Sequence, residues 1–513
     1  MNRQAFFQAF SPKEDNQYLA NLSPYTQPLT QPEVLHLLRR TTLAINWATV
    51  QSLVGKTASE IVELLLNNAL KNPKPTPPVW INDGFKNPSY VPAENRQKLF
   101  DEIYKTLYDQ NYELKRWWIE AMAVDTISIR EKMTLFWHGH FTTKFAIDQI
   151  MPAQLMYRQN DLLRTLHQGN LRTLLESITL DGAMLIFLNG RDSTRKSPNE
   201  NFSRELLELY TMGIGNYTEK DVQEGARILT GWKTNYYTDD YKDQGIFKTF
   251  FASYDHDISA KSYLGGTIKA SVNNLGEEVL QDEVKGMIKL ILEKRAVETA
   301  TFICEKIYRF FVYSNASQSN PEVVADLAKT LRDNNFEIRP VLARLLKSTF
   351  FFDKSNIGIQ IKTPTELIVG VTKHFDVKGD WKEWVMVTMG QELLNPPNVS
   401  GWAGYHKWAD TRTFPFAIQQ IGNFMYNQKD DYLLEWIKQF DDYITPRSLV
   451  KGISTLFLAK AMNDAQLDRY TKILLNNSPD YEWLNMLKVP STAGWRLKLL
   501  MIALSKDPNF HLT

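Results

Sequence analysis

The sequence predicts a mainly α-helical protein of the all-α class, built as one large multi-helix domain with a small β-hairpin insertion. Along most of the 513 residues, apolar side chains recur at helical spacing, and candidate caps and glycine stops separate the helical segments. Residues 233–275 differ, because Tyr, Asp and Gly are prominent there and apolar positions alternate between Ile246 and Tyr254, within the hairpin insertion predicted at about 240–270. Alternation of this kind is typical of a short strand. We therefore expect the hairpin there and helices elsewhere.

The first helices should follow a polar N-terminal arm, predicted over residues 1–30. The main helical domain is predicted over 31–429 and begins at Pro32, a residue that suits the first turn of a helix. A loop rich in Pro and Asn at 71–92 precedes a long amphipathic helix, which is expected from about 94 to 124. Further helices of this domain are expected at 153–168, 171–188, 201–213, 218–231, 277–293, 295–313, 320–334, 338–349, 363–374, 382–393 and 414–426.

The C-terminal part of the chain, residues 430–513, is predicted to be a helical extension that packs onto the main domain. Its apolar residues again recur at helical spacing, which predicts helices at 446–457, 463–474 and 493–505. No fixed-period repeat runs along the chain, so we do not expect a solenoid.

The composition is that of a soluble globular protein, with 43% hydrophobic and 23% charged residues. Lys and Arg number 59 against 58 Asp and Glu, so the net charge gives no attraction to nucleic acid or to an anionic membrane. The single cysteine, Cys304, excludes an internal disulfide and a cysteine-based zinc cluster. No apolar stretch approaches a membrane span of about 18 residues, and from the first residues we expect no secretory signal. We expect a cytoplasmic protein by default, with a periplasmic or envelope location as the alternative.

The segment REKMTLFWHGHFTT, residues 130–143, places two of the eight histidines, His138 and His140, around Gly139. On a helix such a pair diverges by about 200°, whereas on extended backbone both rings share a face. Gly139 could break the helix and let the rings converge. Neutral imidazoles bind Zn, Fe or Cu, so the pair is a candidate for a transition-metal site. Helix capping with a hydrogen-bond network is the alternative interpretation, and general acid–base chemistry is a third.

Two carboxylates complete the candidate catalytic and metal-binding set of His138, His140, Glu205 and Glu208. Glu205 and Glu208 lie three residues apart, so they share a face of the helix predicted there. Arg204 precedes Glu208 by four residues and could form an ion pair with it instead.

Five residues are candidates for binding a polar substrate: Arg204, Arg227, His256, Asp257 and Trp402. The arginines could equally join an ion-pair network between helices. His256 and Asp257 fall in the least helical segment, where loops often carry function, and Trp402 should fill either the core or a cleft. Serine-hydrolase elbows, phosphate-binding loops and dinucleotide fingerprints are absent from the sequence.

Four segments together resemble a bacterial family catalogued as domain of unknown function 1800. They are REKMTLFWHGHFTT from Arg130, NFSRELLELYTMGIGNYTEKDVQEGARILTGW from Asn201, KTPTELIVG from Lys362 and MGQELLNPPNVSGWAGYHKW from Met389. HDISAKSYLG from His256 and CEKIYRFFV from Cys304 are lesser matches. The resemblance implies a predominantly α-helical fold over nearly the whole chain. Many members have a histidine where this chain has Tyr210, which weakens a mechanism that needs a third imidazole there.

The resemblance also implies a partner, because members are often encoded beside a family that resembles alkaline-phosphatase-like proteins. Two classes of function follow, and the sequence leaves open whether the chain is an enzyme. The first is an enzyme, with or without a metal, acting on a polar, glycan-like substrate through the His-Gly-His and Glu cluster. The second is a non-catalytic scaffold or partner protein that works with an envelope-associated alkaline-phosphatase-like protein. The oligomeric state is not predicted.

Overall fold

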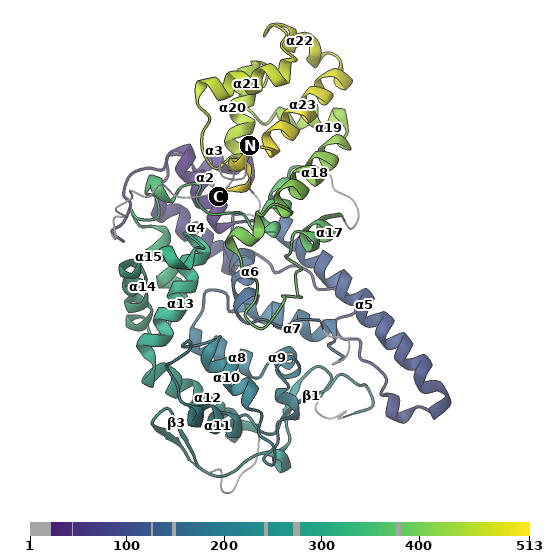
Figure 1. Cartoon of the computed structure of the whole chain (residues 1–513), viewed down its shortest axis with the longest axis vertical. Coiled ribbons are helices and arrows are strands. Elements are labelled where there is room, and N and C mark those ends of the chain that lie inside the picture. The colour runs from purple at the N-terminus through teal and green to yellow at the C-terminus, as the bar shows by residue number, and fades with distance from the viewer. Residues whose placement is uncertain are drawn as a thin grey trace.

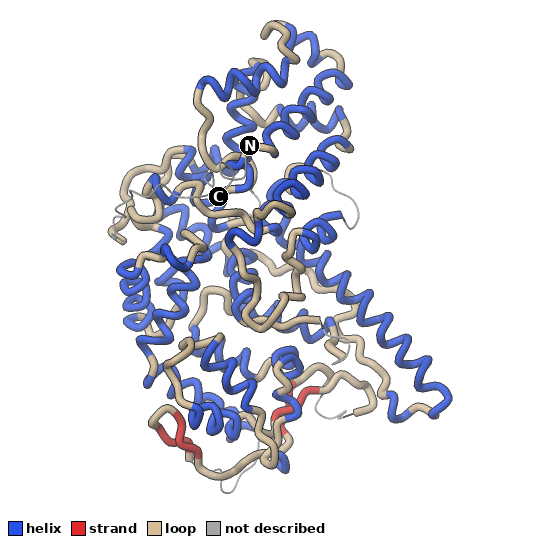
Figure 2. Tube along the Cα trace, in the orientation of Figure 1, coloured by secondary structure: helices blue, strands red, loops and turns tan. Residues whose placement is uncertain are grey.

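The computed structural model describes residues 22–43, 45–124, 127–145, 150–240, 245–269, 277–375 and 381–513. Within these residues the chain forms 22 α-helices and two small antiparallel sheets of two strands each (Figures 1 and 2). The prediction of a mainly α-helical fold with a small β-hairpin region is therefore confirmed. None of the helices described is both long enough and apolar enough to cross a bilayer.

The helices follow one another along nearly the whole described chain. Those of the first half are α2 (Gln31–Thr41), α3 (Trp47–Leu53), α4 (Ala58–Lys71), α5 (Ala93–Val124), α6 (Arg130–His140), α7 (Ala153–Thr165), α8 (Leu171–Thr179), α9 (Gly182–Phe187), α10 (Glu200–Glu208) and α11 (Glu219–Ile228). Those of the second half are α12 (Glu277–Lys294), α13 (Ala296–Phe311), α14 (Pro321–Asp333), α15 (Ile338–Leu346), α16 (Pro364–Thr372), α17 (Trp381–Thr388), α18 (Thr413–Tyr426), α19 (Asp430–Ile437), α20 (Pro446–Phe457), α21 (Asp464–Leu475), α22 (Glu482–Leu487) and α23 (Pro490–Ser505).

Local capping explains most of the helix starts and one difference from the prediction. Thr57 and Thr363 each begin a helix with a capping box, in which the threonine and a glutamate three residues later satisfy each other's backbone N–H. The single helix expected at 171–188 is two helices, because Asp181 caps a new start: its Oδ1 accepts the Met184 N–H at 2.9 Å.

Strands occur only between α11 and α12 among the described residues, in two separate ladders. β1 (Trp232–Thr234) pairs with β2 (Thr249–Phe251), and β3 (Lys261–Tyr263) pairs with β4 (Gly266–Ile268). The second pair is a tight hairpin with a turn of two residues that both have positive φ, as a primed turn requires. The alternating stretch from Ile246 to Tyr254 thus contains β2, which pairs with β1. The tight hairpin formed by β3 and β4 follows it in the sequence.

The core has two main parts, and α6 lies between them (Figure 1). Phe136 and Trp137 of α6 belong to the part built around α2, α4, α8 and α12 to α15, whereas Leu135 belongs to the part built around α5, α7 and α16 to α23. Every residue from Arg130 to His138 is buried, and so is His140. Because neighbours surround α6, its charged residues need internal partners: Arg164 pairs with Glu131 at 2.6 Å.

The described part of the predicted arm, residues 22–30, contacts the chain just after α15 and just before α4. The Tyr25 N–H donates to the Lys347 carbonyl oxygen at 2.7 Å. At the other end of the chain, α23 packs against α18, α19 and α21. The boundaries of the main domain, expected at residues 31 and 430, stay predictions. At the second one, α18 before the boundary and α19 after it both contact α23.

Candidate functional site

The two histidines of the His-Gly-His segment lie on a continuous helix and face different surroundings. α6 runs through Gly139 to His140 and ends only at Phe141, so the expectation that Gly139 breaks the helix is wrong. The physical reason is that a glycine inside a helix costs only about 1 kcal/mol relative to alanine, which burial on all sides of α6 readily offsets. The imidazoles therefore diverge, and they do not converge on one metal position.

His138 is held as a neutral ring among aromatic side chains. Its Nε2 accepts the Leu394 N–H at 3.2 Å, and its ring centroid lies 5.2 Å from that of Trp118 and 5.5 Å from that of Trp402. Burial lowers the pKa of His138 to about 3. His138 thus fixes the loop that follows α17 by accepting one backbone hydrogen bond.

His140 contacts a lysine from a distant part of the chain. Its Nε2–H donates to the Tyr210 carbonyl oxygen at 3.1 Å, which leaves Nδ1 to accept the Lys306 Nζ–H at 2.9 Å. Lys306 lies on α13 and also donates to the Leu209 carbonyl oxygen at 3.0 Å. Burial and the positive charge of Lys306 hold the pKa of His140 well below its ordinary value. Burial and the neighbouring charge of Arg309 lower the pKa of Lys306 to about 7.

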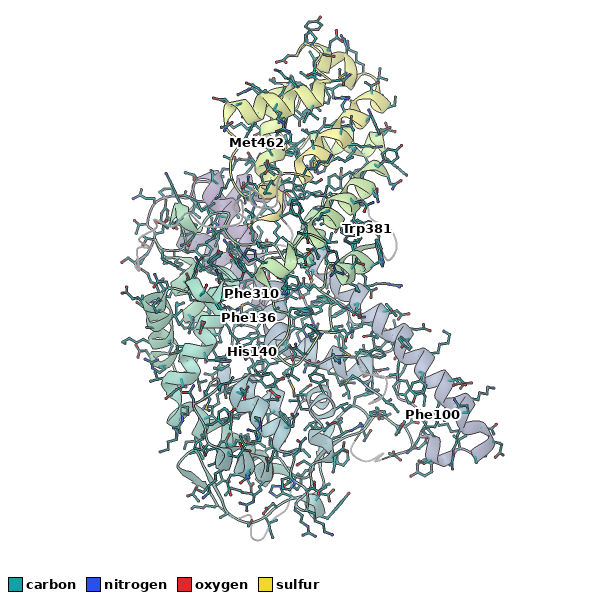
Figure 3. The ribbon with its side chains drawn as sticks, viewed as in Figure 1. Phe100, Phe136, His140, Phe310, Trp381 and Met462 are labelled. Carbon is teal, nitrogen blue, oxygen red and sulfur yellow. The ribbon has the colours of Figure 1, made fainter. Side chains whose placement is uncertain are left out.

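A pocket of about 220 Å³ lies beside this pair, between α6, α13 and the loop at 400–408. Figure 3 shows Phe136, His140 and Phe310 together in the middle of the molecule, where α6 passes α13. The ring of Phe136 lies 5.2 Å from that of Phe310. Aromatic side chains line much of the pocket: Phe136, Phe310, Trp402, Tyr405 and Trp408.

The ionisable lysine and arginine side chains of the pocket wall are basic, and its other polar side chains are neutral. Lys306 and Arg309, one helical turn apart on α13, line it, and none of the described residues that line it is acidic. Gln360 joins the loop before α16 to the C-terminal end of α13. Its Oε1 accepts the Ser314 N–H at 2.8 Å, and its Nε2 donates to the Arg309 carbonyl oxygen at 3.1 Å.

The loop that carries Trp402 rests directly on the end of α6. A Cβ on Gly401, whose φ is +80°, would lie 2.4 Å from the Gly139 carbonyl oxygen. The Thr142 hydroxyl donates to the Val399 carbonyl oxygen at 2.6 Å. Trp402 was predicted to fill the core or a cleft, and it forms part of the pocket wall.

The predicted acidic partners lie on α10 and do not join the histidines. Burial and the neighbouring Glu208 raise the pKa of Glu205, and Glu208 accepts the Tyr217 hydroxyl at 2.6 Å. The i, i+4 spacing of Arg204 and Glu208 suggests an ion pair between them, but Arg204 pairs instead with Glu219 of α11. This pair is bidentate, with N···O distances of 2.9 and 2.5 Å. The α10 segment reaches the pocket through its end, where the carbonyl oxygens of Leu209 and Tyr210 accept from Lys306 and His140.

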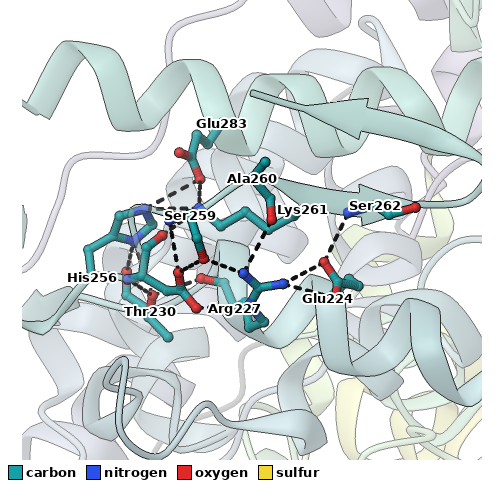
Figure 4. Close-up of polar contacts among 10 residues, drawn as sticks. Glu224, Arg227, Thr230, His256, Ser259, Ala260, Lys261, Ser262 and Glu283 are labelled. Carbon is teal, nitrogen blue, oxygen red and sulfur yellow. Dashed lines mark hydrogen bonds and ion pairs between the residues drawn. The ribbon is translucent and has the colours of Figure 1, made fainter. Parts of the chain in front are cut away.

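His256 lies in a separate polar cluster between α11, α12 and β3 (Figure 4), and Asp257 joins this cluster through Arg227 of α11 and Lys261 of β3. The His256 Nδ1–H donates to the Thr230 carbonyl oxygen at 2.8 Å, and Glu283 lies 3.3 Å from Nε2. Asp257 pairs with Arg227 at 2.8 Å, which together with the Ser259 hydrogen bonds holds the pKa of its carboxyl well below the usual range.

This second cluster joins elements of the fold. Lys261 is buried and pairs with Glu283 at 2.7 Å, and Arg227 also pairs with Glu224 at 2.8 Å. The groups around His256 therefore satisfy one another. This arrangement is the ion-pair network that was the alternative to substrate binding for Arg227.

The described residues contain no group of three or more His, Cys, Asp or Glu side chains placed to hold a metal ion. The hypothesis of a Zn, Fe or Cu site at the four predicted ligands gains no support from this arrangement. What the fold does bring together is His140 and Trp402, with three residues that the sequence reasoning missed: Lys306, Arg309 and Tyr405. The signal available for them was slight, since Lys306 and Arg309 stand in CEKIYRFFV, one of the lesser family matches.

Comparison with known proteins agrees with the resemblance inferred from the motifs. A family model described as a protein of unknown function, DUF1800, matches residues 36–512, which is nearly the whole chain. No curated protein and no solved structure matches it. Four of the segments that carry the resemblance, 130–143, 304–312, 362–370 and 389–408, contribute residues to the pocket beside His140. The chain belongs to the DUF1800 family.

Proposed function

We propose that this protein is an enzyme that binds a polar, glycan-like substrate in the pocket between α6 and α13 and uses Lys306 as its general base. The observation that carries the proposal is the environment of the Lys306 amine, whose pKa is lowered to about 7 by burial and by Arg309. A general base is most effective when its pKa lies near the working pH, because the neutral form is then populated and still basic.

The hydrogen bonds of Lys306 favour a neutral amine. A neutral amine has two N–H groups and one lone pair, and two acceptors are present, His140 Nδ1 at 2.9 Å and the Leu209 carbonyl oxygen at 3.0 Å. Protonation would add a third N–H, and no described residue of the pocket wall offers a carboxylate for it. Both N–H groups are therefore satisfied in the neutral form, and the lone pair is left to accept a proton from a substrate.

His140 acts on the substrate only through Lys306 in this proposal, as a positioning residue. Its Nε2–H is committed to the Tyr210 carbonyl oxygen, so the tautomer with a free Nδ1 lone pair is fixed. That lone pair orients the amine. A ring that turned or became charged would lose this role, because a protonated Nδ1 would face the Lys306 N–H as a second donor.

The walls suit a sugar ring. Aromatic faces pack against the apolar C–H faces of a ring, while a polar edge is recognised by hydrogen bonds. A volume of about 220 Å³ is below the roughly 300–1,000 Å³ of sites for drug-sized ligands. We therefore expect the pocket to take one ring-sized group, with the rest of a chain outside it.

The test compares wild-type protein with Lys306→Met and with Lys329→Met, a matched control whose exposed side chain lies on α14. Each protein is incubated with a panel of neutral and acidic oligosaccharides, and products are detected by mass spectrometry at several pH values around neutrality. We expect turnover by the wild type to rise with pH through about 7, to fall by about 10²-fold or more in Lys306→Met, and to persist in the control. A folded Lys306→Met protein with undiminished turnover would contradict the proposal.

A partner role for this protein is the second candidate, favoured by exposed aromatic side chains on three adjoining helices. Trp384 of α17, Tyr426 of α18 and Trp495 of α23 are exposed, and the last two rings pack at 5.6 Å. Aromatic residues are enriched where proteins bind one another. The test is co-purification with the alkaline-phosphatase-like protein that the family resemblance implies as a partner. Loss of co-purification in a Trp384→Ser/Trp495→Ser variant would support this role. Unchanged co-purification would show that these helices are not the binding site.

A further inference from the structure

We infer that the substrate of this pocket is an acidic sugar, and that Arg309 holds its anionic group. The inference rests on the proposed function, because it names the class of substrate for the same pocket. The charges of the wall, its hydrogen-bond donors and its aromatic side chains support it.

Arg309 has no carboxylate partner among the described residues, whereas several other arginines of this chain do. Arg164 pairs with Glu131, Arg227 with Asp257 and Arg344 with Asp326. Among the described residues, Arg309 forms no such ion pair, and it lines a pocket whose described walls contain no acidic side chain. A guanidinium stays charged at any ordinary pH, so this wall is positive whatever the state of Lys306. A bound anion would supply the missing charge.

The side-chain amides of the wall offer few acceptors. Their oxygens are already used: Gln360 Oε1 accepts the Ser314 N–H, and Gln391 Oε1 accepts from both the N–H and the hydroxyl of Thr365. The guanidinium of Arg309, in contrast, offers hydrogen-bond donors and no acceptor. A ligand rich in acceptors therefore suits the Arg309 side of the wall better than one rich in donors.

The shape of the anion follows from the groups around it. A guanidinium binds carboxylate and sulfate oxygens through two parallel hydrogen bonds. Trp402, Tyr405 and Trp408 stand beside the positive wall and offer faces for the ring that carries the anion. A sugar with a carboxylate or a sulfate meets both requirements, whereas a neutral sugar leaves Arg309 without a counter-charge.

The experiment measures the binding of three trisaccharides to the full chain by calorimetry: a uronate, a sulfated sugar and a neutral sugar. The variants are Arg309→Gln, which removes the charge, Arg309→Lys, which keeps it, and Arg195→Gln, a control that removes an exposed charge elsewhere. We expect the acidic sugars to bind at least tenfold more tightly than the neutral one. We expect Arg309→Gln to abolish that preference, Arg309→Lys to retain part of it, and the control to change nothing.

The outcomes separate this inference from the proposed function. A stronger response to the uronate than to the sulfated sugar would assign the anion as a carboxylate, and the reverse would assign it as a sulfate. Equal binding of neutral and acidic sugars, unchanged in a folded Arg309→Gln protein, would overturn the inference and leave glycan binding in place. If no sugar bound at all, the proposed function would fail together with the inference. Circular dichroism and thermal unfolding of each variant establish that it is folded.

Discussion

Replacing Gly401 by alanine tests whether the loop that carries Trp402 rests on α6 as described. Two penalties add at this position. The φ of +80° is unfavourable for a residue with a Cβ, by about 1–3 kcal/mol, and the new Cβ would lie 2.4 Å from the Gly139 carbonyl oxygen. Overpacking of this kind costs about 1–3 kcal/mol more. We expect Gly401→Ala to lower the free energy of unfolding by about 2–6 kcal/mol, measured by urea denaturation.

Two other glycines separate the two penalties. Gly390 has a φ of +91° with nothing within 4 Å of an added Cβ, so Gly390→Ala should show the backbone penalty alone, about 1 kcal/mol or somewhat more. Gly139 lies in α6, where an added Cβ would make only ordinary contact with the Trp402 ring at 3.8 Å. Gly139→Ala should therefore be neutral or stabilising, by up to about 1 kcal/mol. If Gly401→Ala cost no more than Gly390→Ala, the close approach of the loop to α6 would be refuted.

Three further predictions concern buried groups elsewhere. Arg164→Leu removes the closest ion-pair partner of the buried Glu131, so it should cost about 3–5 kcal/mol in urea unfolding. A double variant with Glu131→Leu should recover part of this cost, and a double variant as unstable as the single one would argue against the pair. Burial lowers the pKa of His138 to about 3, so between about pH 6.5 and 3 the ring gains a proton only when the protein unfolds. The stability of the folded protein should therefore fall as the pH drops through this range. Thermal melts of His138→Gln should show a weaker fall. Burial raises the pKa of the Cys304 thiol, so a thiol reagent should react with it only after denaturation, and rapid native labelling would contradict its placement in the core.

Sequence signals that depend on residues a few positions apart, such as helix caps and helical periodicity, predicted the helices correctly. Thr57 and Thr363 start helices because each has its capping partner three residues away, which is visible in the sequence. The long helix expected from 94 to 124 is α5, whose apolar residues keep a helical period. The same local signals failed at Asp181, where a capping side chain inside an apolar run divides one expected helix into two.

The candidate site could be predicted only in part, because it depends on contacts between distant residues. His140 and Trp402 were singled out from their motifs, but Lys306 meets His140 from 166 residues away, and nothing local marks it. Arg204 shows the same limit, since it pairs with Glu219 on another helix although Glu208 stood at the favoured spacing on its own. Gly139 was misjudged for a different reason: the tendency of glycine to end a helix is weak, and the burial of α6 decides the outcome.

The pocket contains groups that a purely structural role does not explain. A lysine amine and an imidazole that approach each other without a carboxylate are costly to bury, because each must lose its hydration or its charge. An apolar pair of the same size would hold α6 against α13 with no such cost. Segments 130–143, 304–312 and 389–408, which carry the family resemblance, nevertheless bring these groups together beside aromatic walls. The proposed function gives a proton-accepting amine next to a positive, ring-lined pocket a chemical use, and it would account for an arrangement that stability alone disfavours.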